Sequence, residues 1–139
     1  MALLILGFTV ITLLLVVGGI DITAVQLART RMMDAADGAA LDAADSIDLA
    51  STYGAGLRGM VRLSDATVAT VAAGYLARQP IPQGVSSWGL APGTGSPDGH
   101  TAVVRVKGTA RLPLAGPLLQ AFGGSIGLDV ESHARAVVQ

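Results

Sequence analysis

The first twenty residues, MALLILGFTVITLLLVVGGI, contain no charged side chain and no proline. As a helix, the stretch from Ala2 to Ile20 would be about 28 Å long, close to the roughly 30 Å of hydrocarbon in a bilayer. A small soluble domain rarely accommodates a helix that is apolar on every side. The sequence therefore predicts a membrane-spanning helix, whose anchoring side chains are Leu3, Leu4, Ile5, Leu6, Phe8, Val10, Ile11, Leu13, Leu14, Leu15, Val16 and Val17.

The same stretch favours a permanent anchor over a cleaved signal peptide. It is longer than the apolar core of a typical signal peptide, which has about 7–15 residues. No small-x-small cleavage pattern follows it, because Gly18, Gly19 and Ile20 lead directly to Asp21. We expect a transmembrane anchor over residues 1–20, a continuation of the helix outside the membrane over 21–50, and a small α+β domain over 51–139 that packs on it.

Residues 21–50 predict a helix with two distinct faces, since most of them are good helix formers. At 100° per residue, the apolar face contains Met32, Met33, Ala36, Ala40, Ala43 and Ile47. The opposite face contains Asp34, Asp37, Asp42, Asp45 and Asp48. The acidic face is either solvated or in contact with a basic partner.

Small residues recur along this helix at a spacing that permits close helix packing. Ala36, Ala40 and Ala43 form one such face, and small residues four apart allow another backbone to approach. The face can seat the domain's own sheet, a second helix, or both at different heights. Gly19 and Thr23 have the same spacing at the expected membrane exit, above any expected contact with the sheet.

The rest of the chain predicts one helix and about three strands. Ser64 is a good N-cap, Pro80 would end the helix, and residues 51–63 form a glycine-containing break. Strands are expected over 85–90, 100–112 and 126–138, with a short helix or turn over 114–122. Antiparallel pairing of the two long strands would place Arg105, Lys107 and Arg111 on one face with Asp129, Glu131 and Arg135. The predicted fold class is α+β with a small antiparallel sheet.

The residues predict a protein without catalytic, cofactor or metal sites. The chain has no cysteine, and His100 and His133 stand apart from any metal-ligand spacing. The string GAGLRG at 54–59 follows a helix rather than a strand, which argues against dinucleotide binding. A net charge of −1 and few aromatic residues argue against binding of nucleic acid or of a small-molecule substrate. We expect a non-enzymatic protein that acts through protein contacts and the lipid bilayer.

The apolar stretch leads into the phrase ADGAALDAAD at residues 36–45. This combination resembles the N-terminal segment of the TadE/TadG-like proteins of tight-adherence (Flp-type) pilus systems. The string ARLPLAG at residues 110–116 is similar to actinobacterial TadG-related members. The resemblance in sequence covers roughly the first third of the chain, and the remainder agrees in architecture.

The resemblance implies a pilin-like architecture and an accessory or minor-pilin role in a type IVb pilus assembly system. It also implies an anchor in the cytoplasmic membrane, a C-terminal domain outside the cytoplasm, and other pilins or pilus-assembly membrane proteins as partners. The alternatives are a signal-anchored structural or binding protein of another envelope or secretion machine, and an anchored enzyme.

Overall fold

The computed structural model describes residues 1–54 and 63–135, with the side chains of the first helix described as far as Ser46. Its elements in chain order are α1 (Ala2–Gly54), α2 (Asp65–Arg78), β1 (Val85–Leu90), β2 (Thr101–Ala110), α3 (Gly116–Ala121) and β3 (Ile126–Arg135). The three strands form one antiparallel sheet in the order β1-β2-β3. The predicted α+β class, with a long first helix, a second helix and three strands, is confirmed.

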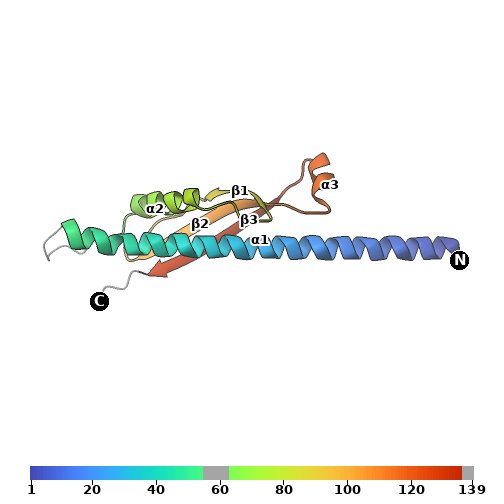
Figure 1. The fold of residues 1–139 in the computed structure, drawn as a ribbon, viewed down its shortest axis with the longest axis horizontal. Helices are drawn as coiled ribbons and strands as arrows, with labels where there is room; N and C mark the ends of the chain where they lie inside the picture. Colours follow the sequence, from blue (N-terminus) through green and yellow to red (C-terminus); the bar gives the residue numbers. More distant parts are fainter. Residues whose placement is uncertain (55–62, 136–139) are drawn as a thin grey trace.

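Helix α1 has 53 residues and runs along the whole molecule (Figure 1). At 1.5 Å per residue it is about 80 Å long. The sheet and α2 lie along its C-terminal half, α3 lies further toward the N-terminus, and the N-terminal end of α1 extends beyond the folded domain (Figure 1). The helix continues to Gly54, beyond the predicted end near Ala50. Ser51, Thr52 and Tyr53 are only modestly unfavourable in helices, so they do not end one. Residues 55–62 of the predicted break lie outside the described part of the chain.

The second helix begins and ends where the sequence predicts. The Ser64 hydroxyl oxygen accepts a hydrogen bond from the backbone N–H of Thr67 at 3.1 Å, which satisfies one free donor of the first turn. The helix ends at Arg78, two residues before Pro80. Its buried side chains are Val68, Ala72 and Leu76, which recur every four residues and face α1 and the sheet.

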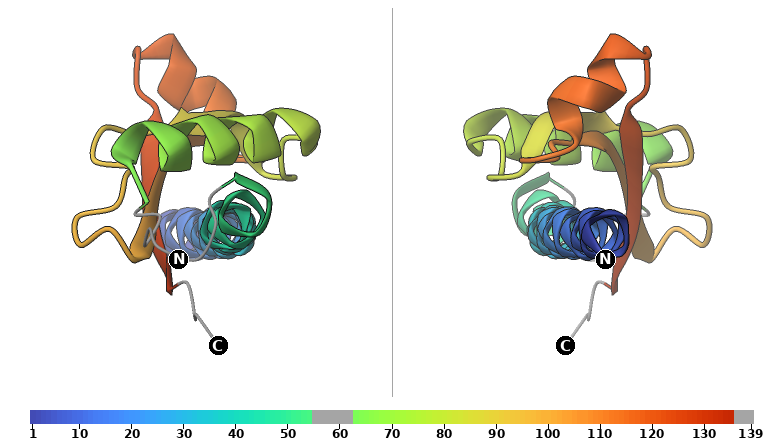
Figure 2. Two further views of the ribbon diagram at one scale, coloured as in Figure 1. Left: turned by 90° about the vertical axis from the view of Figure 1, so that its left-hand side faces the viewer. Right: turned by 90° about the vertical axis from the view of Figure 1, so that its right-hand side faces the viewer.

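Strands β2 and β3 pair in register over their whole length. Arg105 lies opposite Glu131, and Lys107 lies opposite Asp129. The predicted alternation is present, because the aliphatic residues between these charges are buried: Val104, Val106, Leu128 and Val130. Opposite charges are therefore paired on the outer face, and the inner face packs against α1. The end-on views of Figure 2 show α1 against the sheet and α2 lying across α1.

The core contains mostly alanine and valine side chains, with one methionine among them. Met32 of α1 is fully buried, and it lies against Gly108 of β2. A Cβ atom at Gly108 would come within 2.8 Å of the Met32 sulfur and 2.9 Å of the Ser87 carbonyl oxygen. A side chain at Gly108 would therefore require both the Met32 side chain of α1 and the backbone of β1 to shift.

One detail of the predicted helix faces is wrong. Met33 was expected on the buried face but is 39% exposed. It follows Met32 by 100° around the helix, so both cannot point to the sheet. On the acidic face, the side chain of Asp42 is 43% exposed, and its carboxylate also lies 3.3 Å from the Arg78 guanidinium. The reason is that α2 lies beside this part of α1. Asp34, Asp37 and Asp45 are exposed as predicted.

Candidate functional site

The N-terminal half of α1 presents an apolar surface on all sides. The predicted anchor residues from Leu3 to Val16 are exposed, and Val17 is half-buried. Within residues 1–54 and 63–135, α1 is the one helix that is long and apolar enough to cross a membrane by length and composition. The most apolar window of the helix has a mean hydropathy of 2.7, and none of that window is buried in the fold. Exposed apolar surface of this extent marks a membrane or protein contact.

The C-terminal half of the helix packs against the rest of the chain through its small residues. Ala36, Ala40 and Ala43 are completely buried, and they belong to the same core cluster as Val68 of α2 and Val104 of β2. Their small side chains let the sheet and α2 approach the helix backbone closely. This face of the helix is therefore occupied by the chain's own domain.

Gly19 and Thr23 lie on a different part of the helix surface, and both are exposed. A Cβ atom added at Gly19 would meet nothing within 4 Å in the part of the chain that the structure describes. The Thr23 hydroxyl donates a hydrogen bond to the Gly19 carbonyl oxygen at 2.9 Å, so its polar group is satisfied within the helix. This side of the helix is open to a neighbouring helix.

Asp21, the first charged residue of the chain, is only 4% exposed. Its Oδ1 accepts a hydrogen bond from the backbone N–H of Leu114 at 3.1 Å, and its Oδ2 accepts one from Ala115 at 2.8 Å. Ala115 is the N-cap of α3 and has no side-chain cap of its own. Asp21 thus accepts from the two backbone N–H groups that lead into α3 and ties the start of this helix to α1. A lone aspartate directly after an apolar helix is the sequence signal for this role, but its partners lie 93 and 94 positions away and follow no local pattern.

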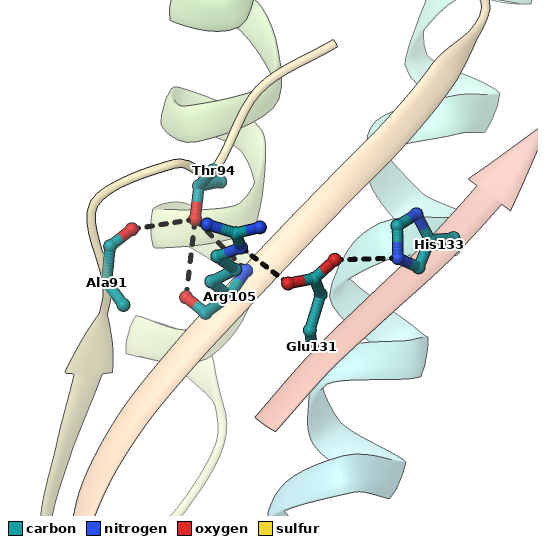
Figure 3. Close-up of polar contacts among 5 residues, drawn as sticks. All are labelled: Ala91, Thr94, Arg105, Glu131 and His133. Carbon is teal, nitrogen blue, oxygen red and sulfur yellow. Dashed lines mark hydrogen bonds and ion pairs between the residues drawn. The ribbon is translucent and has the colours of Figure 1, made fainter. Parts of the chain in front are cut away.

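A row of polar side chains crosses the outer face of the sheet (Figure 3). The Arg105 Nε lies 2.6 Å from Oε2 of Glu131, and the His133 Nε2 lies 2.8 Å from its Oε1. The hydrogen bond from Arg105 lowers the pKa of Glu131, since it stabilises the charged carboxylate. All three side chains are substantially exposed. The arrangement is a solvated ion pair that ties β2 to β3, with the histidine at its side.

The loop between β1 and β2 is fastened to this face. The Thr94 hydroxyl donates to the carbonyl oxygens of Ala91 and Arg105, at 3.0 and 3.3 Å, and accepts from the Arg105 N–H at 3.1 Å (Figure 3). Further along, Asp98 accepts hydrogen bonds from the backbone N–H groups of His100 and Thr101, at 2.9 and 2.6 Å. These bonds lower the pKa of Asp98 to about 2. The contacts fix the turn that leads into β2.

In residues 1–54 and 63–135, no group of three or more histidine, aspartate or glutamate side chains is arranged to hold a metal ion. The candidate features are surfaces and contacts rather than pockets. They are the exposed apolar half of α1, the exposed side of the helix at Gly19, and the hydrogen bonds that attach the start of α3 to Asp21. Such features are suited to contacts with a membrane and with other proteins.

Comparison with known proteins adds one match to these observations. No curated protein and no solved structure matches the chain. A family model does match, and it covers both the exposed apolar half of α1 and the alanine-rich part that packs on the domain. Residues 1–46 match the family described as "Putative Flp pilus-assembly TadE/G-like", which links this chain to a tight-adherence pilus system.

Proposed function

We propose that this chain is a single-pass membrane protein of a tight-adherence pilus assembly system, with a minor-pilin-like or accessory role. One observation carries the proposal. A single uninterrupted helix is apolar and largely exposed from Ala2 to Ile20, and one of its faces is buried by its own domain from Ala28 to Ala44. This division gives a bilayer-spanning part and a part that displays a small folded domain at the membrane surface.

The family match supports the same division. It spans residues 1–46, and therefore includes the anchor and the helix that carries the domain. The folded domain packs along that helix and would move with it as one unit. Contacts made by the anchor within the membrane would then determine where the domain is placed, either beside the assembly machinery or in the filament.

The orientation in the membrane follows from the proposed role. Charge gives little help, because no basic residue precedes the apolar stretch and Arg29 and Arg31 follow it. A pilus component must present its domain where the filament is built. We place residues 21–139 outside the cytoplasm and the anchor in the cytoplasmic membrane.

Membrane extraction tests the anchor. The full chain should remain in the membrane fraction after washing with high salt and with alkaline carbonate. A shortened chain should begin at Asp21 rather than near Thr23, because Asp21 bonds to Leu114 and Ala115. This shortened chain should be soluble. Release of the full chain by salt alone would refute the proposed anchor.

A reporter fused after Gln139 tests the orientation. A reporter enzyme that functions only outside the cytoplasm should be active in this fusion. A second fusion, to a reporter that functions only in the cytoplasm, should be inactive. The opposite pair of results would overturn the orientation and, with it, the role in building a filament.

The competing function is that of an anchored structural or binding protein in another envelope or secretion machine. The two functions differ in their partners. Capture of the full chain from solubilised membranes should recover pilins or pilus-assembly membrane proteins under the proposed function. Recovery of the components of a different envelope machine, without any pilus protein, would favour the competitor.

A further inference from the structure

The connection between β2 and β3 carries a row of exposed apolar side chains within a segment that contains no charged residue. Leu114, Leu118 and Phe122 are 47%, 66% and 84% exposed, and they are spaced four residues apart across α3. Residues 112–128 contain no charged side chain. We name residues 112–124 the α3 loop. An exposed leucine alone is ordinary, but a phenylalanine and two leucines on one uncharged loop require an explanation.

The α3 loop lies at the level where α1 would leave the membrane. Asp21, one residue beyond the apolar stretch, accepts hydrogen bonds from the backbone of Leu114 and Ala115. These bonds fix the start of the α3 loop against α1 at this height. Figures 1 and 2 show that α3 projects sideways from α1 rather than along it. If α1 crosses the bilayer, α3 extends along the bilayer surface.

The end of the loop directs Phe122 away from the fold. The backbone N–H of Gly124 donates to the Leu119 carbonyl oxygen at 2.8 Å, and Gly123 adopts a positive φ of 72°. This glycine turn closes α3 immediately after Phe122. Leu119, by contrast, is half-buried, and a Cβ atom added at Gly124 would lie 3.0 Å from its Cγ. Leu118 and Phe122 therefore remain together on the outer side.

We propose that the α3 loop is a second membrane contact, with Leu114, Leu118 and Phe122 inserted into the interfacial region of the lipid bilayer. The inference rests on the proposed membrane anchor. Lipid is the occupant that best fits three observations: the height fixed by Asp21, the lack of charge from residue 112 to 128, and the exposed apolar side chains of Ile20 and Ile22, which flank Asp21 in α1. Apolar side chains in the interface are buried to about 5–10 Å.

The contact of the α3 loop with lipid would determine the orientation of the domain relative to the membrane. A helix of six residues is too short to hold a protein on a bilayer alone. The anchor, however, keeps α3 at the surface, so its insertion becomes an intramolecular event. Two attachment points, α1 and α3, would fix both the tilt of the helix and the rotation of the domain about it. The outer face of the sheet would then be presented in one direction.

Spin labels at single cysteines test the contact, because the chain has no cysteine of its own. The full chain would be labelled at Leu118→Cys or Phe122→Cys and reconstituted at low density in phosphatidylcholine vesicles. The collision rates of each label with oxygen, which concentrates in lipid, and with a water-soluble nickel chelate would be measured. Leu14→Cys reports on the anchor. Leu41→Cys is the matched surface control, since Leu41 is 58% exposed and about 30 Å further along α1 than Asp21.

For labels at positions 118 and 122, we expect a ratio of oxygen collisions to chelate collisions several-fold higher than for the label at position 41. This ratio should be lower than for the label at position 14. A label at 122 as accessible to the chelate as the one at 41, with the label at 14 in lipid, would overturn the inference and leave the anchor intact. Protection of 118 and 122 from both reagents would also overturn it, since it would indicate a protein partner. A water-exposed label at 14 would overturn the anchor itself.

Discussion

Asp21 of α1 accepts a hydrogen bond from the backbone N–H of Ala115, 94 positions further along the chain, at 2.8 Å. Together with the hydrogen bond from the Leu114 N–H, this bond joins the α3 loop of the folded domain to the end of the apolar stretch of α1. The carboxylate of Asp21 is buried, and the hydrogen bonds that it accepts from these two N–H groups stabilise it there. The aspartate therefore controls how firmly the α3 loop is attached to α1.

Replacement of Asp21 by alanine should loosen the α3 loop and destabilise the domain by about 1–3 kcal/mol, because two backbone N–H groups lose their acceptor. Asp21→Asn should cost less, since one amide oxygen can still accept. The measurement is thermal unfolding of the full chain in detergent, with amide exchange at Leu114 and Ala115. Asp34→Ala, which removes an exposed carboxylate from the same helix, should change neither property.

A second prediction concerns the buried face of α1 formed by Ala36, Ala40 and Ala43. Ala40 is completely buried between α1 and the domain, so Ala40→Leu should overpack the interface and cost about 1–3 kcal/mol. The matched control is Ala73→Leu on α2, where the alanine is exposed. Thermal unfolding of both variants should show a clear loss for the first and almost none for the second. Equal stability of the two would mean that this face can open to accommodate a larger side chain.

Much of this fold follows from local patterns in the sequence. The apolar stretch, the cap at Ser64 and the stop before Pro80 each depend on a few neighbouring residues. The alternation of β2 and β3 also predicted the charge pairing, and the pairs Arg105–Glu131 and Lys107–Asp129 are present in the register. Patterns of period 2 and 3.6 identify the elements and the faces that they bury.

The features that were missed depend on how distant elements meet. The role of Asp21 requires the strand connection to return to the end of the apolar stretch, which no periodicity reveals. The contact of Asp42 with Arg78 depends on where α2 lies. The exposure of Met33 depends on which of two adjacent methionines faces Gly108. In the candidate site, the sequence predicted the apolar surface, the small residues and the position of Gly19 and Thr23 above the sheet. It left open whether the face of Ala36, Ala40 and Ala43 packs on the sheet, on a second helix or on both.

A further prediction concerns the pKa of Glu131 on the outer face of the sheet. Arg105 lowers the pKa of Glu131 from its ordinary value of 4.5, so the ion pair contributes stability above that pH and loses it as the pH falls through the lowered pKa. Arg105→Met should raise the pKa of Glu131, and His133→Gln should raise it less, because the arginine provides the larger effect. Glu131 is the only glutamate in the chain, so its carboxyl carbon can be followed in an NMR titration without ambiguity.

The result that would contradict this account is an unchanged pKa of Glu131 in Arg105→Met. The effect on overall stability should be small in every case, since these side chains are substantially exposed and salt screens such pairs. An acid-induced loss of the fold that tracks Glu131 alone is therefore not expected.

The last prediction concerns Gly19, which is exposed on the open side of the helix next to Thr23. Because a Cβ at Gly19 meets nothing in the described structure, Gly19→Leu should leave the melting temperature of the domain unchanged. If a partner helix packs on this side, the larger side chain would hold the two backbones apart. We expect the variant to remain in the membrane but to lose co-purification with its pilus partners. Leu14→Ala removes bulk from an exposed anchor residue that lies about 140° around the helix from Gly19, and it should retain them. Full retention of partners by Gly19→Leu would show that this side of the helix faces lipid, and that the partners are held by the domain instead.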